Sequence, residues 1–240
     1  MAQLEMTPES AFTATTTPYP VDVRISSFLR AVYGWMFVGL CMTALVAAWV
    51  GATPDLVHRI MADPASRWTM ILTQLGIVVV LAGAAGSLPP VIAAPLFLLY
   101  SGLTGVTVSM VVARFSGESI ATTFLVTAGM FGSMAVYGTV TRNSLAGWGQ
   151  FLFMGLVGLV LASFVGVFFS SPGLRFVLSI VSVIVFTGLA AYDAQRLKVM
   201  ALAFPESRHG SYAVVGALVL YLDFINLFLT MLRFFGKARR

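Results

Sequence analysis

Residues 211–235 read SYAVVGALVLYLDFINLFLTMLRFF, a run in which only Asp223 and Arg233 carry a charge. An α-helix of about 20 apolar residues spans the hydrocarbon core of a bilayer, so this run is long enough to cross a membrane. Lipid offers no hydrogen-bond partner to backbone amides and carbonyls, which restricts a continuous apolar run of this length to an α-helix. The run therefore predicts a membrane-spanning helix that carries a carboxylate near its centre.

Six more apolar runs precede this one, each bounded by charged residues, proline or turn residues. They lie at residues 31–50, 69–87, 91–113, 120–140, 146–169 and 174–197. Most of the connections between them are short, so consecutive helices must be antiparallel neighbours. The pattern predicts an all-α integral membrane protein with a bundle of seven transmembrane helices.

The composition is typical of the same class. Of the 240 residues, 59% are hydrophobic and 10% are charged, whereas soluble globular domains have about 45–50% apolar and about 25% charged residues. These values exclude an ordinary cytosolic enzyme and a disordered chain. A disulfide scaffold is excluded because Cys41 is the only cysteine. The net charge of +5 comes from basic residues scattered at the ends of runs, which does not indicate a nucleic-acid partner.

The N-terminal residues differ in composition from the rest of the chain. Residues 1–25 are mostly polar and include a threonine-rich stretch at residues 13–17. We expect a flexible polar tail over residues 1–25 and a transmembrane domain over residues 26–240. A loose terminal segment is also what an ATP-dependent protease needs in order to engage a protein.

Two carboxylates lie inside apolar runs. Asp193 is near the end of run 174–197, and Asp223 is at the centre of run 211–235. A charged side chain at the centre of the bilayer costs about 2.5–3.5 kcal/mol even on the insertion scale, so such a residue indicates a functional site by default. The connection between the two runs is long enough for their helices to pack side by side. We therefore expect the two carboxyl groups to meet.

Two carboxyl groups in a poorly solvated site tend to share one proton, so the charge of the pair changes with pH. After deprotonation, the pair offers the hard oxygen ligands that Ca²⁺ prefers. Asp193 and Asp223 are therefore the candidate pH-sensing and ion-binding residues and the candidate Ca²⁺ ligands. The alternative is a structural pair, in which Arg196 neutralises Asp193 and a hydroxyl or backbone group holds Asp223. The candidate supporting residues near the two aspartates are Tyr192, Arg196, Asn226 and Thr230.

Other catalytic or cofactor-binding motifs are absent from the sequence. His58 and His209 lie in separate predicted loops without a partner at metal-ligand spacing, so no zinc site is expected. The sequence contains no glycine-rich phosphate loop, no Gly-x-Ser-x-Gly and no His-Glu-x-x-His. We expect no cofactor other than a transient Ca²⁺ ion.

Two stretches of the sequence together resemble a known family. The run Ala190-Ala191-Tyr192-Asp193-Ala194-Gln195, followed by Leu220-Tyr221-Leu222-Asp223-Phe224-Ile225-Asn226, is similar to the paired signature of the Bax inhibitor-1 family of membrane proteins, and residues 28–33 and 124–131 agree with it. The resemblance covers about residues 26–235. It implies a seven-helix bundle whose last helix is central or partly re-entrant. It also implies a di-aspartyl pH sensor at Asp193 and Asp223 and a pH-dependent Ca²⁺ leak.

The resemblance has further implications for contacts and partners. An arginine in the second helix of the family latches one aspartate, and Arg67, at the start of the second run, is the candidate for it here. The short loops and polar tail are similar to the bacterial branch, whose members interact with the membrane-bound protease FtsH. The resemblance thus implies a multi-pass protein of the bacterial inner membrane. Its expected partners are the lipid bilayer, calcium or another cation, and an FtsH-type protease.

Three functions compete on these grounds. The first is a pH-dependent calcium or cation leak, which is not an enzyme, and the second is a regulatory partner of FtsH whose main role is not transport. The third is an intramembrane aspartyl protease, since those enzymes also place two aspartates on neighbouring helices. Tyr192-Asp193 matches half of the protease signature. The other half, Gly-x-Gly-Asp, is missing because Asp223 follows Tyr221-Leu222.

Overall fold

A computed structural model of the protein describes residues 20–53, 55, 62–84, 87–168 and 171–237. These residues form long helices and contain no β-strand. The helices are α2 (Val21–Gly51), α4 (Pro64–Gly83), α5 (Pro90–Val112), α6 (Gly117–Val140), α7 (Ala146–Phe168), α8 (Pro172–Ala203) and α9 (His209–Phe235), with a short 3₁₀ turn η2 (Glu206–Arg208) before α9. The part of the chain that the structure describes has seven helices long and apolar enough to cross a membrane, which confirms the predicted fold class.

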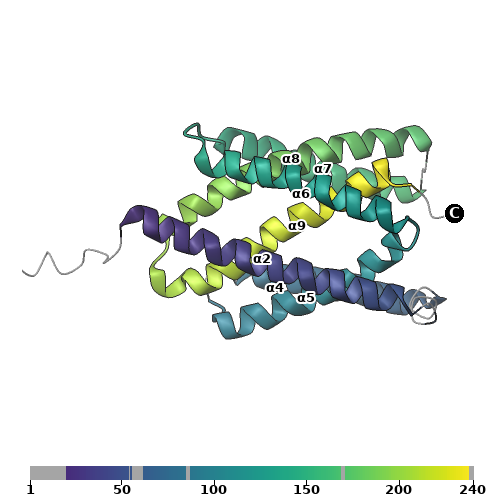
Figure 1. The fold of residues 1–240 in the computed structure, drawn as a ribbon, viewed down its shortest axis with the longest axis horizontal. Helices are drawn as coiled ribbons and strands as arrows, with labels where there is room; N and C mark the ends of the chain where they lie inside the picture. The colour runs from purple at the N-terminus through teal and green to yellow at the C-terminus, as the bar shows by residue number, and fades with distance from the viewer. Residues whose placement is uncertain (1–19, 54, 56–61, 85–86, 169–170, 238–240) are drawn as a thin grey trace, which may run out of the picture.

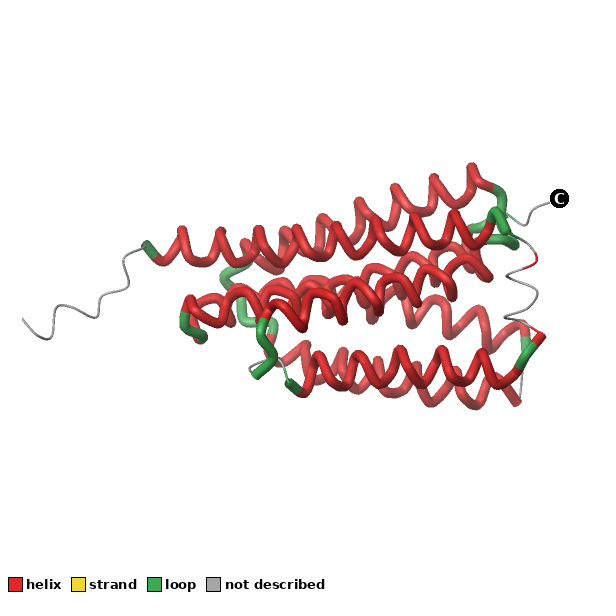
Figure 2. The backbone as a smooth tube through the Cα atoms, turned by 90° about the horizontal axis from the view of Figure 1, so that it is seen from below, coloured by secondary structure: helices red, strands yellow, loops and turns green. Residues whose placement is uncertain are grey.

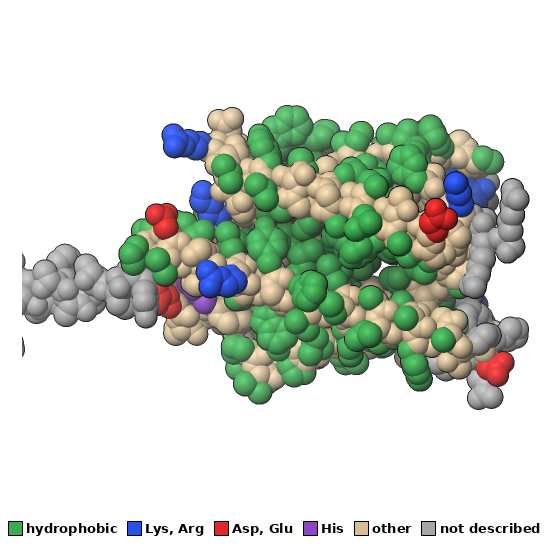
Figure 3. All heavy atoms as spheres, viewed as in Figure 1, with side chains coloured by type: hydrophobic (Ala, Val, Ile, Leu, Met, Phe, Trp, Pro, Cys, Tyr) green, Lys and Arg blue, Asp and Glu red, His purple; other side chains and the backbone are tan. Residues whose placement is uncertain are grey.

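The helices run along one common axis, and their connections lie at the two ends of the bundle (Figure 2). The first spanning helix begins at one end and the last one ends at the other (Figure 1), as an odd number of spans requires. Apolar side chains cover the middle of the face shown in Figure 3, and charged side chains gather toward the two ends. This distribution is expected for a protein whose middle lies in hydrocarbon and whose ends lie in water.

α9 lies between two groups of three helices (Figure 1). One group contains α2, α4 and α5, and the other contains α6, α7 and α8. α9 packs against α2, α5, α6 and α8, and it is the most buried of the spanning helices. It is also one continuous helix from His209 to Phe235. The last helix is therefore central, as predicted, and it crosses the bundle instead of re-entering.

Two helices are longer than the apolar runs that predicted them. α2 begins at Val21 and not near residue 31, so residues 21–25 of the expected tail are helical. α8 continues to Ala203, six residues beyond the end of its predicted run. Hydropathy locates only the uninterrupted apolar part of a helix. Asp22, Arg24 and Arg30 interrupt the first extension, and Lys198 separates the second one from its apolar run. Residues 1–19 of the expected tail lie outside the described residues.

Small residues allow helices to approach closely within both groups. A Cβ atom added at Gly105 of α5 would lie 2.8 Å from the carbonyl oxygen of Thr43 in α2. A Cβ atom added at Gly138 of α6 would collide with the backbone of Ala191 in α8. Ala191 lies two residues before Asp193, so the contact with Gly138 determines how closely α8 packs against α6 next to that aspartate.

We expect Gly138→Ala to destabilise the bundle by about 1–3 kcal/mol, because the added methyl group forces α6 and α8 apart. Gly129→Ala, on the same helix, is the matched control, since a Cβ atom there meets nothing within 4 Å. Thermal unfolding of the two detergent-solubilised variants measures the difference. Equal melting temperatures would contradict the close contact between α6 and α8.

Candidate functional site

Asp193 of α8 and Asp223 of α9 lie side by side inside the bundle. Their carboxyl groups are close enough to interact directly, and only 7% of Asp193 and 6% of Asp223 is exposed. An ionised carboxylate only accepts hydrogen bonds, whereas a protonated one can also donate. Two carboxyl groups this close in a poorly solvated site tend to share one proton.

The carboxyl pair lines a cavity of about 510 Å³ between α7, α8 and α9. Tyr192, Arg196 and Asn226 belong to the same wall, together with apolar side chains such as Phe153 and Phe186. One oxygen of Asp223, Oδ2, is buried and has no hydrogen-bond partner among the described residues. A buried carboxylate oxygen without a partner is costly. The cavity therefore contains an acceptor that a proton, a water molecule or a cation would satisfy.

The other predicted residues differ in how close they come to the pair. Arg196 is exposed, lines the cavity and acts electrostatically on Asp193. Asn226 and Tyr192 are half-buried in the cavity wall. Thr230 does not line the cavity, and its hydroxyl donates to the backbone carbonyl of Asn226 at 2.7 Å. Arg196 is thus the predicted cation that the structure brings to the pair.

Arg67 lies away from the aspartates. It is exposed in the first turn of α4, a helix that packs against α5. Its charge acts on Asp63, the N-cap residue of the same helix. Hydrogen bonds from the Ser66 hydroxyl and from the backbone amides of Ala65 and Ser66 lower the pKa of Asp63, and Arg67 adds to this effect. The latch implied by the family resemblance therefore does not form at Arg67 in this structure.

Two polar side chains of α8 that the sequence analysis did not single out hold the end of α6 and the loop after it. Gln195 accepts a hydrogen bond from the backbone amide of Leu145 at 2.8 Å and donates to the carbonyl of Asn143 at 2.9 Å. Lys198 donates to the carbonyl of Thr139 at 3.0 Å. The last carbonyls of a helix lack partners within the helix, and the Lys198 bond satisfies one of them. These bonds fix the position of α8, and hence of the aspartate on it, along α6.

The opposite face of α9 carries a second buried polar contact. The hydroxyl of Tyr221 lies 2.6 Å from that of Thr43 in α2, and Thr43 donates to the carbonyl of Ser101 in α5 at 2.9 Å. All three residues are buried. α9 is therefore held by polar contacts to both groups of helices, through Asp223 on one side and Tyr221 on the other.

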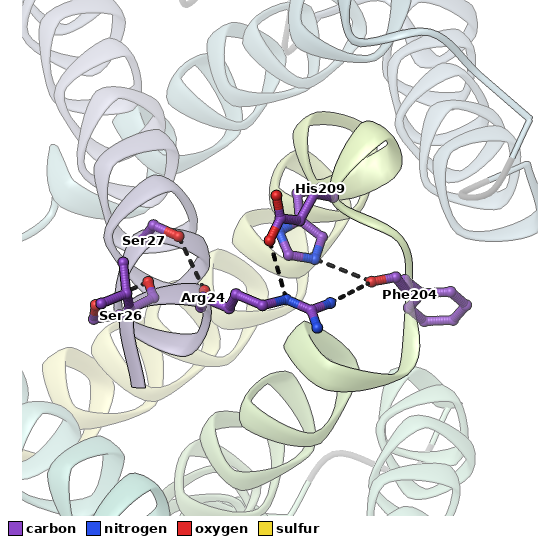
Figure 4. A network of polar contacts seen from close by, with 7 residues as sticks. Arg24, Ser26, Ser27, Phe204 and His209 are labelled. Carbon is purple, nitrogen blue, oxygen red and sulfur yellow. Dashed lines mark hydrogen bonds and ion pairs between the residues drawn. The ribbon is translucent and has the colours of Figure 1, made fainter. Parts of the chain in front are cut away.

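A third polar cluster joins the start of α2 to the connection between α8 and α9. Arg24 pairs with Glu206 at 3.2 Å and donates to the carbonyl of Phe204 at 3.3 Å. His209 Nε2 lies 3.2 Å from the same carbonyl, and its ring packs edge-on against Phe28. Figure 4 shows Arg24 and His209 both pointing at this oxygen. The cluster fixes the first turn of α9 against α2, and His58, the other histidine, lies outside the described residues.

The fold and the site together define a class of protein, a multi-pass membrane protein with a pair of carboxyl groups in its interior. A family model described as inhibitor of apoptosis-promoting Bax1 matches residues 25–240. The chain is 43% identical to the inner membrane protein YbhL of Escherichia coli over 218 residues, which cover 90% of this chain and 93% of YbhL. The chain belongs to the Bax inhibitor-1 family and is an integral protein of the inner membrane, as the resemblance of its two aspartate motifs implied.

Other bacterial relatives match over nearly their whole length. An uncharacterized protein of Borreliella burgdorferi is 43% identical over 216 residues, which cover 89% of this chain and 93% of the relative. An uncharacterized protein of Rickettsia prowazekii is 34% identical over 228 residues, which cover 95% of this chain and 96% of the relative. The similarity therefore extends over all seven spans and is not confined to the aspartate motifs.

We expect Gln195→Ala to destabilise the protein by about 1 kcal/mol, because the amide of Leu145 and the carbonyl of Asn143 lose their partner. Hydrogen exchange of residues 141–145 should become faster, and the melting temperature should fall. Gln150→Ala on α7 is the matched control, since Gln150 is exposed and makes no hydrogen bond within the described part of the chain. Unchanged exchange in Gln195→Ala would show that the loop does not depend on α8.

Proposed function

We propose that the protein is a pH-dependent cation leak in which Asp193 and Asp223 sense pH and Ca²⁺ is the ion that passes. The observation that supports this function best is the buried, unpartnered oxygen of Asp223, which lies beside a second carboxyl group in the wall of a cavity. A carboxylate inside a membrane protein is expensive and indicates an ion or proton pathway by default. A purely structural pair would satisfy both oxygens of each carboxyl group.

The direction of the pH dependence follows from the close approach of the two buried carboxyl groups. While the pair holds a proton, the two carboxyl groups attract each other and keep α8 and α9 together. Loss of that proton places two negative charges side by side, and their repulsion in a poorly solvated site is strong. The helices then separate at the cavity, where the two carboxylates attract a cation. Flux is therefore expected to rise as the pH rises through the range in which the pair loses its proton.

The ligands around the pair suit an ion that binds briefly. Ca²⁺ takes six to eight oxygen ligands, whereas Asp193 and Asp223, with the amide oxygen of Asn226, offer only part of that number. Within the described ranges, no group of three or more histidine, cysteine, aspartate or glutamate side chains could hold a metal ion. Conduction requires binding that is weak enough for the ion to leave. The donor set therefore favours passage over storage.

Arg196 opposes a cation in the same cavity. Its positive charge lies on the exposed side of the pair, where it repels an entering ion and partly balances the carboxylates after deprotonation. In this proposal Arg196 limits the leak. It does not bind the ion.

We expect Ca²⁺ entry into proteoliposomes to rise with pH in the wild-type protein, by up to about tenfold per pH unit within the titration range of the pair. Asp223→Asn should give a flat pH profile, because an amide can keep the hydrogen bond to Asp193 but has no proton to lose. Ca²⁺ flux measured with an entrapped fluorescent indicator at a series of external pH values tests this directly.

Asp22→Asn is the matched control, because Asp22 is an exposed carboxylate in the first turn of α2. It should leave the pH profile unchanged. Size-exclusion chromatography and melting temperature confirm that each variant is folded before its flux is compared. A pH-independent leak in the wild-type protein, or the same pH profile in wild type and folded Asp223→Asn, would reject the proposal.

The two alternative functions lead to different observations. The FtsH partnership is implied by the resemblance to the bacterial branch of the family, with the polar tail over residues 1–25 as the segment that the protease would engage. Residues 1–19 lie outside the described residues, so the partnership stays a prediction. An intramembrane protease would use the same two aspartates, and the pairing of Asp193 with Asp223 therefore does not separate it from a leak. Cleavage of a membrane peptide that is lost in Asp193→Ala would favour the protease.

A further inference from the structure

A second cavity lies where the start of α6 meets the end of α9. It has a volume of about 590 Å³ and shares no lining residue with the cavity at the aspartates. An apolar cavity of about 260 Å³ adjoins it, since Met130, Met231 and Phe235 line both. The adjoining cavity extends along α8 past Ile180 and Ile184. Together they form a hollow that begins at the end of two spanning helices and continues into the membrane-embedded part of the bundle.

The lining of this hollow changes from charged to apolar along one face of α6. Glu118 and Ser119 lie in the first turn, Thr123 comes next, and Met130 lies about 18 Å from the first turn at 1.5 Å per residue. Lys237, directly after α9, lines the charged end. The order from charge through hydroxyl to thioether matches the order of headgroup, glycerol ester and acyl chain across a lipid leaflet.

The hydroxyl of Thr123 is a candidate hydrogen-bond donor to an oxygen atom of a ligand in the hollow. Thr123 is only 6% exposed and lines the cavity, yet its hydroxyl makes no hydrogen bond with the described residues. Its neighbour along the helix, Thr127, instead donates to the backbone carbonyl of Thr123 at 2.8 Å. Among the described residues, the hydroxyl of Thr123 is therefore an available donor in the cavity wall.

The charged end of the hollow is built from backbone contacts between Lys237 and the start of α6, and two side-chain charges line it. The amide of Lys237 donates to Ser119 Oγ at 3.0 Å, and the carbonyl of Lys237 accepts from the amide of Ser116 at 3.1 Å. Gly236 allows this approach, because a Cβ atom there would lie 2.5 Å from the ring of Phe115. Within the described ranges, the ammonium group of Lys237 and the carboxylate of Glu118 form no ion pair.

We propose that this hollow binds a zwitterionic phospholipid with a primary ammonium headgroup, of the phosphatidylethanolamine class. Lys237 contacts its phosphate, Glu118 its ammonium group and Thr123 an ester carbonyl, while an acyl chain lies against Met130, Met231 and the side chains beyond them. Among the described residues, Lys237 and Glu118 place one charge of each sign at the mouth, which complements a headgroup that carries both charges. An anionic lipid would satisfy Lys237 and leave Glu118 opposed to a negative charge.

The two charges also have simpler explanations that involve no ligand. An acidic residue in the first turn of a helix stabilises that helix through its dipole, and a lysine after the last turn of a span commonly extends to the interface. Neither explanation predicts any preference between lipid headgroups. Selectivity for one headgroup is therefore the measurement that separates a binding site from these structural roles.

The test is binding of defined lipids to the delipidated full-length protein in detergent, followed by native mass spectrometry. The probes are a short-chain phosphatidylethanolamine, the phosphatidylglycerol with the same chains, and phosphoethanolamine without chains. The ethanolamine lipid should bind about twofold to fivefold more tightly than the glycerol lipid, the difference expected of an exposed ion pair. Phosphoethanolamine alone should not bind detectably, because it lacks the chain.

Three variants locate the site. Glu118→Gln should remove the preference for the ethanolamine lipid and leave binding of the glycerol lipid unchanged, whereas Asp22→Asn, an exposed carboxylate on α2, should change neither. Val126→Trp should fill the cavity and abolish binding of both lipids. Leu125→Trp, on the neighbouring exposed position of the same helix, should bind as wild type does. Thr123→Val should weaken both lipids by a similar factor.

The outcomes are decisive because none of these substitutions touches the aspartate cavity. Equal affinity of the wild-type protein for both lipids would overturn the proposal, as would a preference that survives Glu118→Gln. Wild-type binding by folded Val126→Trp would also overturn it. A loss of Ca²⁺ flux in Asp223→Asn with unchanged lipid selectivity would leave it intact, so the two proposals fail independently.

Discussion

The contact between the buried carboxyl groups of Asp193 and Asp223 is the interaction on which the rest of the arrangement depends. Neither carboxyl group could be placed against lipid without a large cost, so both must lie inside the bundle, and each must meet a polar partner there. Asp223 lies at the middle of α9, and this helix must therefore be surrounded by protein. The central position of α9, with a group of three helices on either side, is the packing that satisfies this requirement.

The same helix is attached to the two groups by different chemistry. Asp223 joins it to α8 through a contact that depends on a proton, whereas Tyr221 joins it to α2 and α5 through hydroxyl and carbonyl groups that stay neutral over the physiological range. A change of pH therefore acts on one side of α9 only. The group of α2, α4 and α5 serves as the fixed side of the site, and the contact between α8 and α9 is the side that can loosen.

The sequence was sufficient to predict the seven spans and the two aspartates, because both follow from the cost of polar groups in hydrocarbon. The contact between Asp193 and Asp223 could be expected as well, since their helices are consecutive and the connection between them is long enough for the helices to pack side by side. Hydrogen-bond partners that come from distant parts of the chain could not be predicted from the sequence. Gln195 and Lys198 bind backbone groups near residues 139–145, and hydropathy contains no signal for a side chain that caps another helix. For Arg67 the sequence predicted a contact that the structure does not contain. Arg67 is the arginine expected near the aspartates, but it lies on α4, which packs against α5, and its charge acts on Asp63.

Both cavities border α9, although at different depths. Asp223 and Asn226 form part of one wall, and Met231 and Phe235 form part of the other, so one rigid helix connects them. A displacement of α9 that separates Asp223 from α8 must also move Met231 relative to α6. A lipid bound in the second cavity would therefore favour one position of α9. By linkage, a change at the carboxyl pair that moves α9 would change the affinity of the second cavity for that lipid by the same factor by which the lipid shifts the equilibrium at the pair. The chain thus has a physical route by which the composition of the surrounding membrane could act on the carboxyl pair.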